Sequence, residues 1–308
     1  MSRIFIFVIA LGTLLPSIGF SDEGLRPITE LKNEAGYRDA YWEVTGCGGA
    51  KIHSSRNLIL TALHCVTNEI DSISPLSEKQ YGNEFAYDAI VRFLPLQGTM
   101  LKNGMKVIAA GKCWTGLDLE ALSISPEFQK EAVECGLEDW AILESPTAGP
   151  SQCFPINLSE KETVSVFAMG ATKKKIERLG TTLDLKGNVY TEGNGLSETS
   201  LTQESHVFRD LWKGLLPTIG KTLFDSFRIT DGDVLNGMSG GPVVNRQFEL
   251  IGVTATALMP TNLWKFPGAH SFESGYNAGI HGAIRIEDIK RQMDSSGEAF
   301  FSSLFDCK

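Results

Sequence analysis

Short apolar segments separated by turn residues run through most of the chain. β-Branched and aromatic residues are concentrated in them, as in the strands of a sheet. The segments are YWEVTGCG, NLILTALHCV, DAIVRFLP, MKVIAAG, DWAILES, ETVSVFAMG, FRIT, GPVVN and ELIGVTATAL. Many short strands are typical of β-barrels and sandwiches rather than of alternating βαβ units. The pattern therefore predicts an all-β fold.

Helical periodicity is confined to two segments, residues 207–216 and the segment RIEDIKRQMD at 285–294. Each places apolar residues on one face, so each is expected to pack against the rest of the protein. Between two strand-rich halves lies SPTAGPSQCFP, residues 145–155, whose prolines, glycine and small polar residues predict a linker. The apolar helical positions are Phe208, Leu211, Trp212 and Leu215 in the first segment and Ile286, Ile289 and Met293 in the second.

The first residues have the organisation of a secretory signal peptide. Arg3 precedes an apolar run over 4–15, and the small residues Ser17, Gly19 and Ser21 follow as cleavage positions. The run is shorter than the roughly 18 apolar residues that a membrane span requires. We therefore expect residues 1–21 to be removed, and the mature protein to be secreted or periplasmic without membrane association.

The net charge narrows the choice of partners. Lys and Arg total 28 against 37 Asp and Glu, which gives a formal net charge of -9. A negative protein is not drawn to polyanions. Nucleic acid and anionic membranes are therefore not expected as partners.

Six cysteines in an exported chain predict disulfides rather than free thiols. Their spacing lacks the paired clusters of zinc sites, so no metal is expected. Six cysteines allow many pairings, and spacing alone selects none of them.

Three residues offer the parts of a nucleophilic site. Ser239 lies in the glycine-rich stretch NGMSGGPVV, His64 ends the apolar segment LTALHC, and Asp139 begins another in LEDWAIL. A serine hydroxyl becomes nucleophilic when a base accepts its proton, and a carboxylate improves that base by fixing its tautomer.

The stretches TALHC, DWAIL and GMSGGP resemble, in this order, the three signature stretches of chymotrypsin- and trypsin-like serine peptidases. The resemblance extends from about residue 41 to the C-terminal helix. It implies two six-stranded antiparallel Greek-key β-barrels, with the active site between them, and a C-terminal helix. The N-terminal barrel would span residues 22–152 and the C-terminal barrel with the helix residues 153–308.

The resemblance also implies a role for each residue. His64 would be the general base, Asp139 the residue that orients it, and Ser239 the nucleophile. The backbone amides of Gly237 and Ser239 would form the oxyanion hole, which requires a tight turn. Proteins or peptides would be the substrates of a monomer that needs neither cofactor nor metal.

Met238 distinguishes the chain from animal trypsin-like enzymes, which have an aspartate before the serine to bind the new N-terminal amine. An apolar side chain cannot pair with an ammonium group, so this activation is excluded. The chain is similar in this to the bacterial secreted branches, including glutamyl endopeptidases and HtrA-type proteases. A longer spacing from His64 to Asp139 predicts an insertion between Val66 and Gly136, and the cysteine that animal enzymes have shortly before the serine is absent.

The family's histidine-loop disulfide corresponds here to Cys47–Cys65. By elimination, Cys113 would pair with Cys135 and Cys153 with Cys307.

Asp233, six residues before Ser239, matches the carboxylate at the base of the trypsin primary pocket. It would favour cleavage after Arg or Lys. A solvated or turn-capping Asp233 is an equal alternative, and glutamyl endopeptidases carry an aspartate at this spacing too. Val234 then favours basic specificity, because glutamate-specific enzymes have a hydroxyl residue there.

Two other functions remain open: a catalytically silent binding module with the same fold, and an esterase using the same three residues. The complete set of residues favours the peptidase. The other histidines match no motif and are interpreted as structural; they are His53, His206, His270 and His281.

Overall fold

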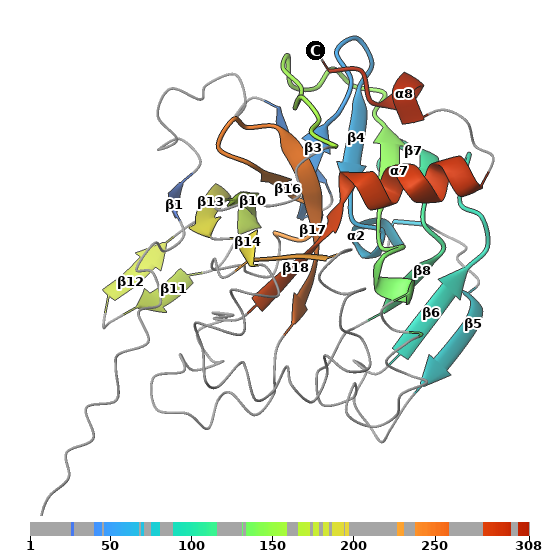
Figure 1. The fold of residues 1–308 in the computed structure, drawn as a ribbon, viewed down its shortest axis with the longest axis horizontal. Coiled ribbons are helices and arrows are strands. Elements are labelled where there is room, and N and C mark those ends of the chain that lie inside the picture. The colour runs from blue at the N-terminus through green and yellow to red at the C-terminus, as the bar shows by residue number, and fades with distance from the viewer. Residues whose placement is uncertain are drawn as a thin grey trace, which may run out of the picture.

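The structure is a computed structural model in which most described residues belong to β-strands (Figure 1). It describes residues 26–27, 40–44, 46–67, 69–70, 75–80, 89–115, 131, 134–158, 166–172, 175–178, 181–184, 187–193, 195–196, 227–230, 238–258, 280–296 and 301–307.

The first half of the chain forms two antiparallel sheets. The order of the five-stranded sheet is β2 (Tyr41–Val44), β3 (Cys47–Lys51), β4 (Leu58–Thr61), β9 (Ala141–Glu144) and β7 (Lys106–Ala110). The order of the three-stranded sheet is β5 (Pro75–Gln80), β6 (Ala89–Phe93) and β8 (Cys113–Thr115).

The second half forms an eight-stranded sheet and a small hairpin. The order of the large sheet is β1 (Arg26–Pro27), β13 (Gly187–Gly193), β10 (Val166–Thr172), β16 (Pro242–Val244), β17 (Leu250–Leu258), β18 (Ile280–Arg285), β15 (Phe227–Thr230) and β14 (Gly195–Leu196). The hairpin pairs β11 (Lys175–Arg178) with β12 (Thr181–Asp184). The strand β1 therefore joins the sheet of the second half.

In the part of the chain that the structure describes, three helices carry labels: α2 (His64–Thr67), α7 (Ile286–Ser295) and α8 (Phe301–Leu304). The helix predicted near the C-terminus is confirmed as α7, which buries Ile286, Ile289 and Met293 as its periodicity requires. The other predicted helix, 207–216, lies outside the described residues. None of the helices in the described part of the chain is long and apolar enough to span a bilayer.

The strands β4 and β9 consist almost entirely of apolar residues, LILT and AILE, because they lie in the centre of the sheet. Leu58 and Leu60 of β4 belong to one hydrophobic cluster, whereas Ile59 between them belongs to another. Ile142 and Leu143 of β9 divide in the same way. Both faces of this sheet are therefore buried, and neither strand shows a polar side.

The larger of these clusters joins the two halves of the chain. It contains Leu58 from β4, Val253 from β17, Ile284 from β18 and Ile289 from α7. The helix α7 follows directly on β18 and contacts β17 and β18. In Figure 1 it runs from these strands towards the side of the molecule where β4 and β7 lie. The two halves consequently share a core.

The chain crosses from one half to the other through the segment expected as a linker. The buried Lys51, 5% exposed, donates from Nζ to the carbonyl oxygen of Pro150 at 2.5 Å, and its burial lowers its pKa. Further on, the Leu250 amide in β17 donates to the Pro155 carbonyl oxygen at 2.6 Å. Both halves thus hold the crossover, the first at Pro150 and the second at Pro155.

Three disulfides connect the six cysteines, and they are the pairs expected from the sequence. They are Cys47–Cys65, Cys113–Cys135 and Cys153–Cys307. Three disulfides indicate an oxidising environment, extracellular or periplasmic.

The strands in the described part of the chain form open sheets of eight, five, three and two strands. The mostly β character agrees with the sequence, and every ladder between named strands is antiparallel. The closed six-stranded barrels stay a prediction. The signal peptide expected at 1–21 lies outside the described residues.

Candidate active site

His64 and Asp139 meet because the strands beside them are antiparallel neighbours. Thr61 at the end of β4 pairs with Ala141 at the start of β9. The chain leaves β4 at the same edge at which it enters β9, so residues just beyond Thr61 and just before Ala141 come together. His64 begins α2 there rather than ending a strand, and Asp139 precedes β9 by two residues.

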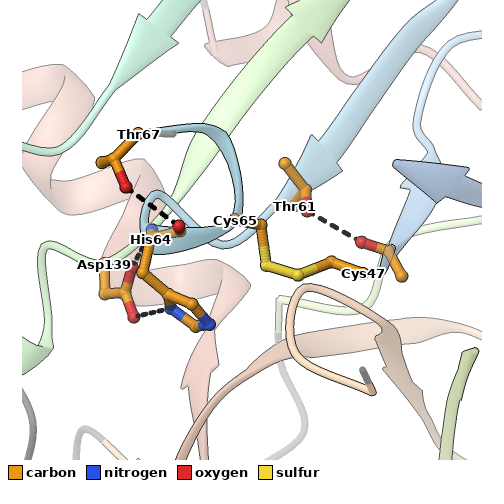
Figure 2. Close-up of a disulfide and its surroundings, with 7 residues drawn as sticks. Cys47, Thr61, His64, Cys65, Thr67 and Asp139 are labelled. Atoms are coloured by element: carbon orange, nitrogen blue, oxygen red, sulfur yellow. Dashed lines mark hydrogen bonds and ion pairs between the residues drawn. A yellow bond between two sulfur atoms is a disulfide. The ribbon is translucent and has the colours of Figure 1, made fainter. Parts of the chain in front are cut away.

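Two hydrogen bonds join the pair (Figure 2). The Nδ1 of His64 lies 2.7 Å from Oδ2 of Asp139, and the backbone amide of His64 donates to Oδ1 at 2.8 Å. Asp139 is 1% exposed, whereas His64 keeps part of its ring accessible. With Nδ1 donating to the carboxylate, the other ring nitrogen, Nε2, is left to accept a proton.

The electrostatics of His64 combine opposing effects. Burial disfavours its positive charge, while the charge of the Asp139 carboxylate and the hydrogen bond to it favour that charge. The net result is a His64 pKa above the ordinary value. The pair is therefore suited to taking up a proton and holding it.

Ser239 lies in a tight turn that leads into β16. The Gly241 amide donates to the Met238 carbonyl oxygen at 3.0 Å, and Gly240 has a φ of 75°. The neighbouring strand β17 holds the turn: the Gly240 amide donates to the Thr254 carbonyl oxygen at 2.6 Å. Met238 is buried, as an apolar side chain at this position should be, and Ser239 is half-buried.

The first half of the chain holds the same turn. The Gly48 amide, from β3, donates to the carbonyl oxygen of Ser239 at 2.8 Å. A Cβ on Gly240 would lie 2.8 Å from the amide nitrogen of Ala62, two residues before His64. The segments that carry Ser239 and His64 are thus in contact.

In the described part of the chain, no hydrogen bond joins the Ser239 hydroxyl to His64. Such bonds are often long without substrate and tighten when it binds.

Two further groups surround the His64 ring. The Trp114 indole, on β8, lies with its centroid 6.4 Å from that of the imidazole at an interplanar angle of 41°. Cys47 and Cys65 also place their sulfurs within 4.8 Å of a ring nitrogen of His64, a spacing that would suit a metal ion. These two sulfurs are joined to each other, so they provide no thiolate ligands.

Two predicted site residues, Gly237 and Asp233, lie outside the described part of the chain, as does Val234 beside them. The histidines His206 and His270, interpreted as structural, lie outside it too. Of the other histidines, His53 is buried, and its Nδ1 accepts hydrogen bonds from the amides of Ser55 and Arg56, both at 3.1 Å. This arrangement supports its interpretation as a structural residue.

Two contacts at the site had not been predicted. The Thr61 hydroxyl donates to the Gly48 carbonyl oxygen, and the Gly48 amide holds Ser239. Thr61 and Gly48 stand in the segments quoted from the sequence, but the partner of each depends on strand pairing and on the contact between the halves. Neither is visible in one sequence.

No family model matches the chain, and no curated protein matches it by sequence. Among solved structures, it is similar to an HtrA-type protease, AlgW, with a tripeptide: 17% identity and a TM-score of 0.38, over 82% of this chain and 56% of that one. A second structure, of AlgW with a decapeptide, has 17% identity and a TM-score of 0.37 over 82% and 52% of the two chains. The chain spans just over half the length of these proteins.

Proposed function

We propose that the protein is a serine endopeptidase that cleaves peptide bonds with Ser239, His64 and Asp139. The observation that carries the proposal is the buried Asp139 carboxylate hydrogen-bonded to His64 Nδ1 at 2.7 Å, beside the turn of Ser239. A carboxylate in this place fixes the tautomer in which Nε2 accepts a proton and stabilises the imidazolium that results. The His64 side chain is also partly exposed, as a base that meets a substrate must be.

In the proposed reaction, Ser239 Oγ attacks the carbonyl carbon of the peptide bond, and its proton passes to Nε2 of His64. The carbonyl oxygen becomes an oxyanion, which the amides of Gly237 and Ser239 stabilise. The C–N bond then breaks, and His64 returns the proton to the leaving amine. Water, deprotonated by His64, hydrolyses the acyl-enzyme and restores Ser239.

We also propose the domain boundaries, the two closed barrels and the cellular location of the protein. Residues 1–21 act as a signal peptide, residues 22–152 and 153–308 form two six-stranded Greek-key barrels of the chymotrypsin type, and the mature protein is a secreted or periplasmic monomer. Support comes from the sheets, which divide between the two halves in all strands except β1, and from the three disulfides.

The test is covalent labelling of the purified protein with a fluorophosphonate. The wild type is expected to be labelled on Ser239 and the variant Ser239→Ala to remain unlabelled, because only an activated serine displaces the fluoride. Equal labelling of both proteins would refute the assignment. A folded wild type that is not labelled would instead favour the silent binding module.

The proposed specificity is for Arg or Lys before the cleaved bond, with Asp233 at the base of the pocket. A buried carboxylate attracts a cationic side chain and binds an uncharged one poorly, because it then stays unpaired. Profiling on a peptide library should show faster cleavage after Arg or Lys, and Asp233→Ser should abolish the preference. Cleavage after Glu at equal or greater rate would indicate a glutamyl-endopeptidase-like specificity.

A further inference from the structure

The hydroxyl of Thr61 lies where the two halves of the proposed site meet. Thr61 is 0% exposed, and its Oγ1 donates to the carbonyl oxygen of Gly48 at 2.7 Å. Figure 2 shows this bond on the far side of the Cys47–Cys65 disulfide from Asp139. The hydroxyl takes no part in the proposed proton transfers.

Gly48 extends this contact to the nucleophile. Its carbonyl oxygen is bound by Thr61, and its amide is bound to the carbonyl oxygen of Ser239 at 2.8 Å. Thr61 itself precedes His64 by three residues. Two hydrogen bonds through one glycine therefore connect the segment of the general base with the segment of the nucleophile.

Gly240 packs directly on the same hydroxyl. A Cβ at this position would lie 2.2 Å from Oγ1 of Thr61 and 2.5 Å from the carbonyl oxygen of Gly48. The backbone that follows the nucleophile thus rests on the Thr61–Gly48 hydrogen bond with no room for an additional carbon atom. A shift of this bond would be transmitted to the turn of Ser239.

We infer that Thr61 is a positioning residue, whose hydroxyl fixes Ser239 relative to His64 through Gly48. The inference rests on the proposed peptidase function and deepens it. A misplacement of about 1 Å costs on the order of 100-fold in rate, so a bond at this place controls the efficiency of attack. The bonds between His64 and Asp139 do not involve Thr61, so its removal should leave the pKa of His64 unchanged.

The test compares Thr61→Val, which has nearly the same shape without the hydroxyl, with Thr61→Ser, which keeps the hydroxyl. Thr67→Val is the matched control, because Thr67 Oγ1 donates to the His64 carbonyl oxygen at 3.0 Å without contacting Gly48. The readouts are the rate of fluorophosphonate labelling and the kcat and KM for a p-nitrophenyl ester, each over a range of pH and below every variant's melting temperature.

Thr61→Val should lower kcat and the labelling rate by about 10- to 100-fold, with KM almost unchanged, because the loss is in alignment. Thr61→Ser and Thr67→Val should stay within about threefold of wild type, and the pH midpoint should not move. A structural role alone would lower the melting temperature without this split between kcat and KM.

A Thr61→Val protein with wild-type rates would overturn the inference, as would equal losses in the valine and serine variants. If Thr61→Val does not fold, Thr61→Ala replaces it, and equal rates for the alanine and serine variants would overturn the inference. A wild type that is not labelled would refute the proposed function, and the inference would fall with it. A labelled wild type with an insensitive Thr61→Val would refute the inference alone.

Discussion

The imidazole of His64 is subject to opposing influences from its surroundings. Burial favours the neutral ring, and Asp139 favours the charged one through its charge and its hydrogen bond. The carboxylate prevails, so the pKa of His64 is raised. A general base must be neutral before it accepts a proton. The proposed enzyme should therefore lose activity as the pH falls through a value above the ordinary histidine pKa of about 6.5.

Replacing Asp139 by Asn tests this directly. Asn has no charge and removes the influences that raise the His64 pKa, so the acid limb of kcat/KM against pH should move to lower pH. The rate on the plateau should fall by on the order of 10⁴-fold, because the amide no longer fixes the productive tautomer. A pH profile that stays in place while the rate falls would contradict this account of the pKa.

The turn that carries Ser239 offers a second test on a single residue. Gly240→Ala would force a side chain into a left-handed conformation and against Thr61 and Gly48. We expect a loss of about 2–5 kcal/mol in the free energy of unfolding together with a loss of activity. Urea unfolding and ester hydrolysis measure the two effects.

Gly98→Ala provides the matched control. Gly98 has a φ of 84°, but nothing lies within 4 Å of the position of its Cβ. Only the backbone strain remains, at about 1–2 kcal/mol, and the activity should be retained. If Gly240→Ala and Gly98→Ala lose equal free energy of unfolding, the clash of the new Cβ with Thr61 contributes nothing to the loss.

At the scale of elements, the helix α7 supports the loop that carries Asp139. Gln292 accepts a hydrogen bond from the Trp140 indole at 2.7 Å and donates to the Leu137 carbonyl oxygen at 2.8 Å. The Gln292 side chain thus binds Leu137 and Trp140, which lie before and after Asp139 in the chain. The C-terminal helix is therefore connected to the proposed site as well as to the core.

Gln292→Leu should lower the free energy of unfolding by about 1–3 kcal/mol, because it leaves two partly buried groups without partners. We also expect a lower kcat, since the Asp139 loop loses its support. Asp294→Asn is the control on the same helix. It breaks only the exposed pair with Lys290 and should change stability by less than about 0.5 kcal/mol. A similar response of both variants in urea unfolding would contradict the role of Gln292.

Local patterns predicted only part of the strands, and they did not predict how the elements are arranged. The strands outside the quoted segments are β1, β5, β8, β11, β12, β13, β14 and β18. Each quoted apolar segment contains a strand, and α7 follows its periodicity, because both patterns are local. The strand β1 pairs with β13, more than 150 residues away in the chain, and no local pattern indicates this. His64 and Asp139 were named from their motifs, whereas Thr61, Gly48 and Gln292 act through distant partners.

At the scale of the whole molecule, the disulfide Cys153–Cys307 joins the crossover to the end of the chain. Its sequence separation is 154 residues, so it restricts the unfolded chain strongly. The C-terminal segment is held in the folded protein by other contacts too, since the Ser54 amide donates to the Asp306 carbonyl oxygen at 2.8 Å. The disulfide should therefore act mainly on the unfolded state.

Replacing both Cys153 and Cys307 by Ala should reduce the free energy of unfolding by about 4–5 kcal/mol while leaving the fold intact. Urea unfolding gives the stability, and circular dichroism checks the fold. A loss below about 1 kcal/mol would mean that the unfolded chain is already restricted without this bond.

The hydrogen bond from the Gly48 amide to the carbonyl oxygen of Ser239 affects when the proposed site can form during synthesis of the chain. Synthesis produces His64 and Asp139 well before Ser239, and the turn that carries the serine is held partly by the half that was made first. Neither half alone contains a complete site. For the proposed peptidase this would provide latency without an inhibitor, because a chain that is still being synthesised could not yet cleave its neighbours.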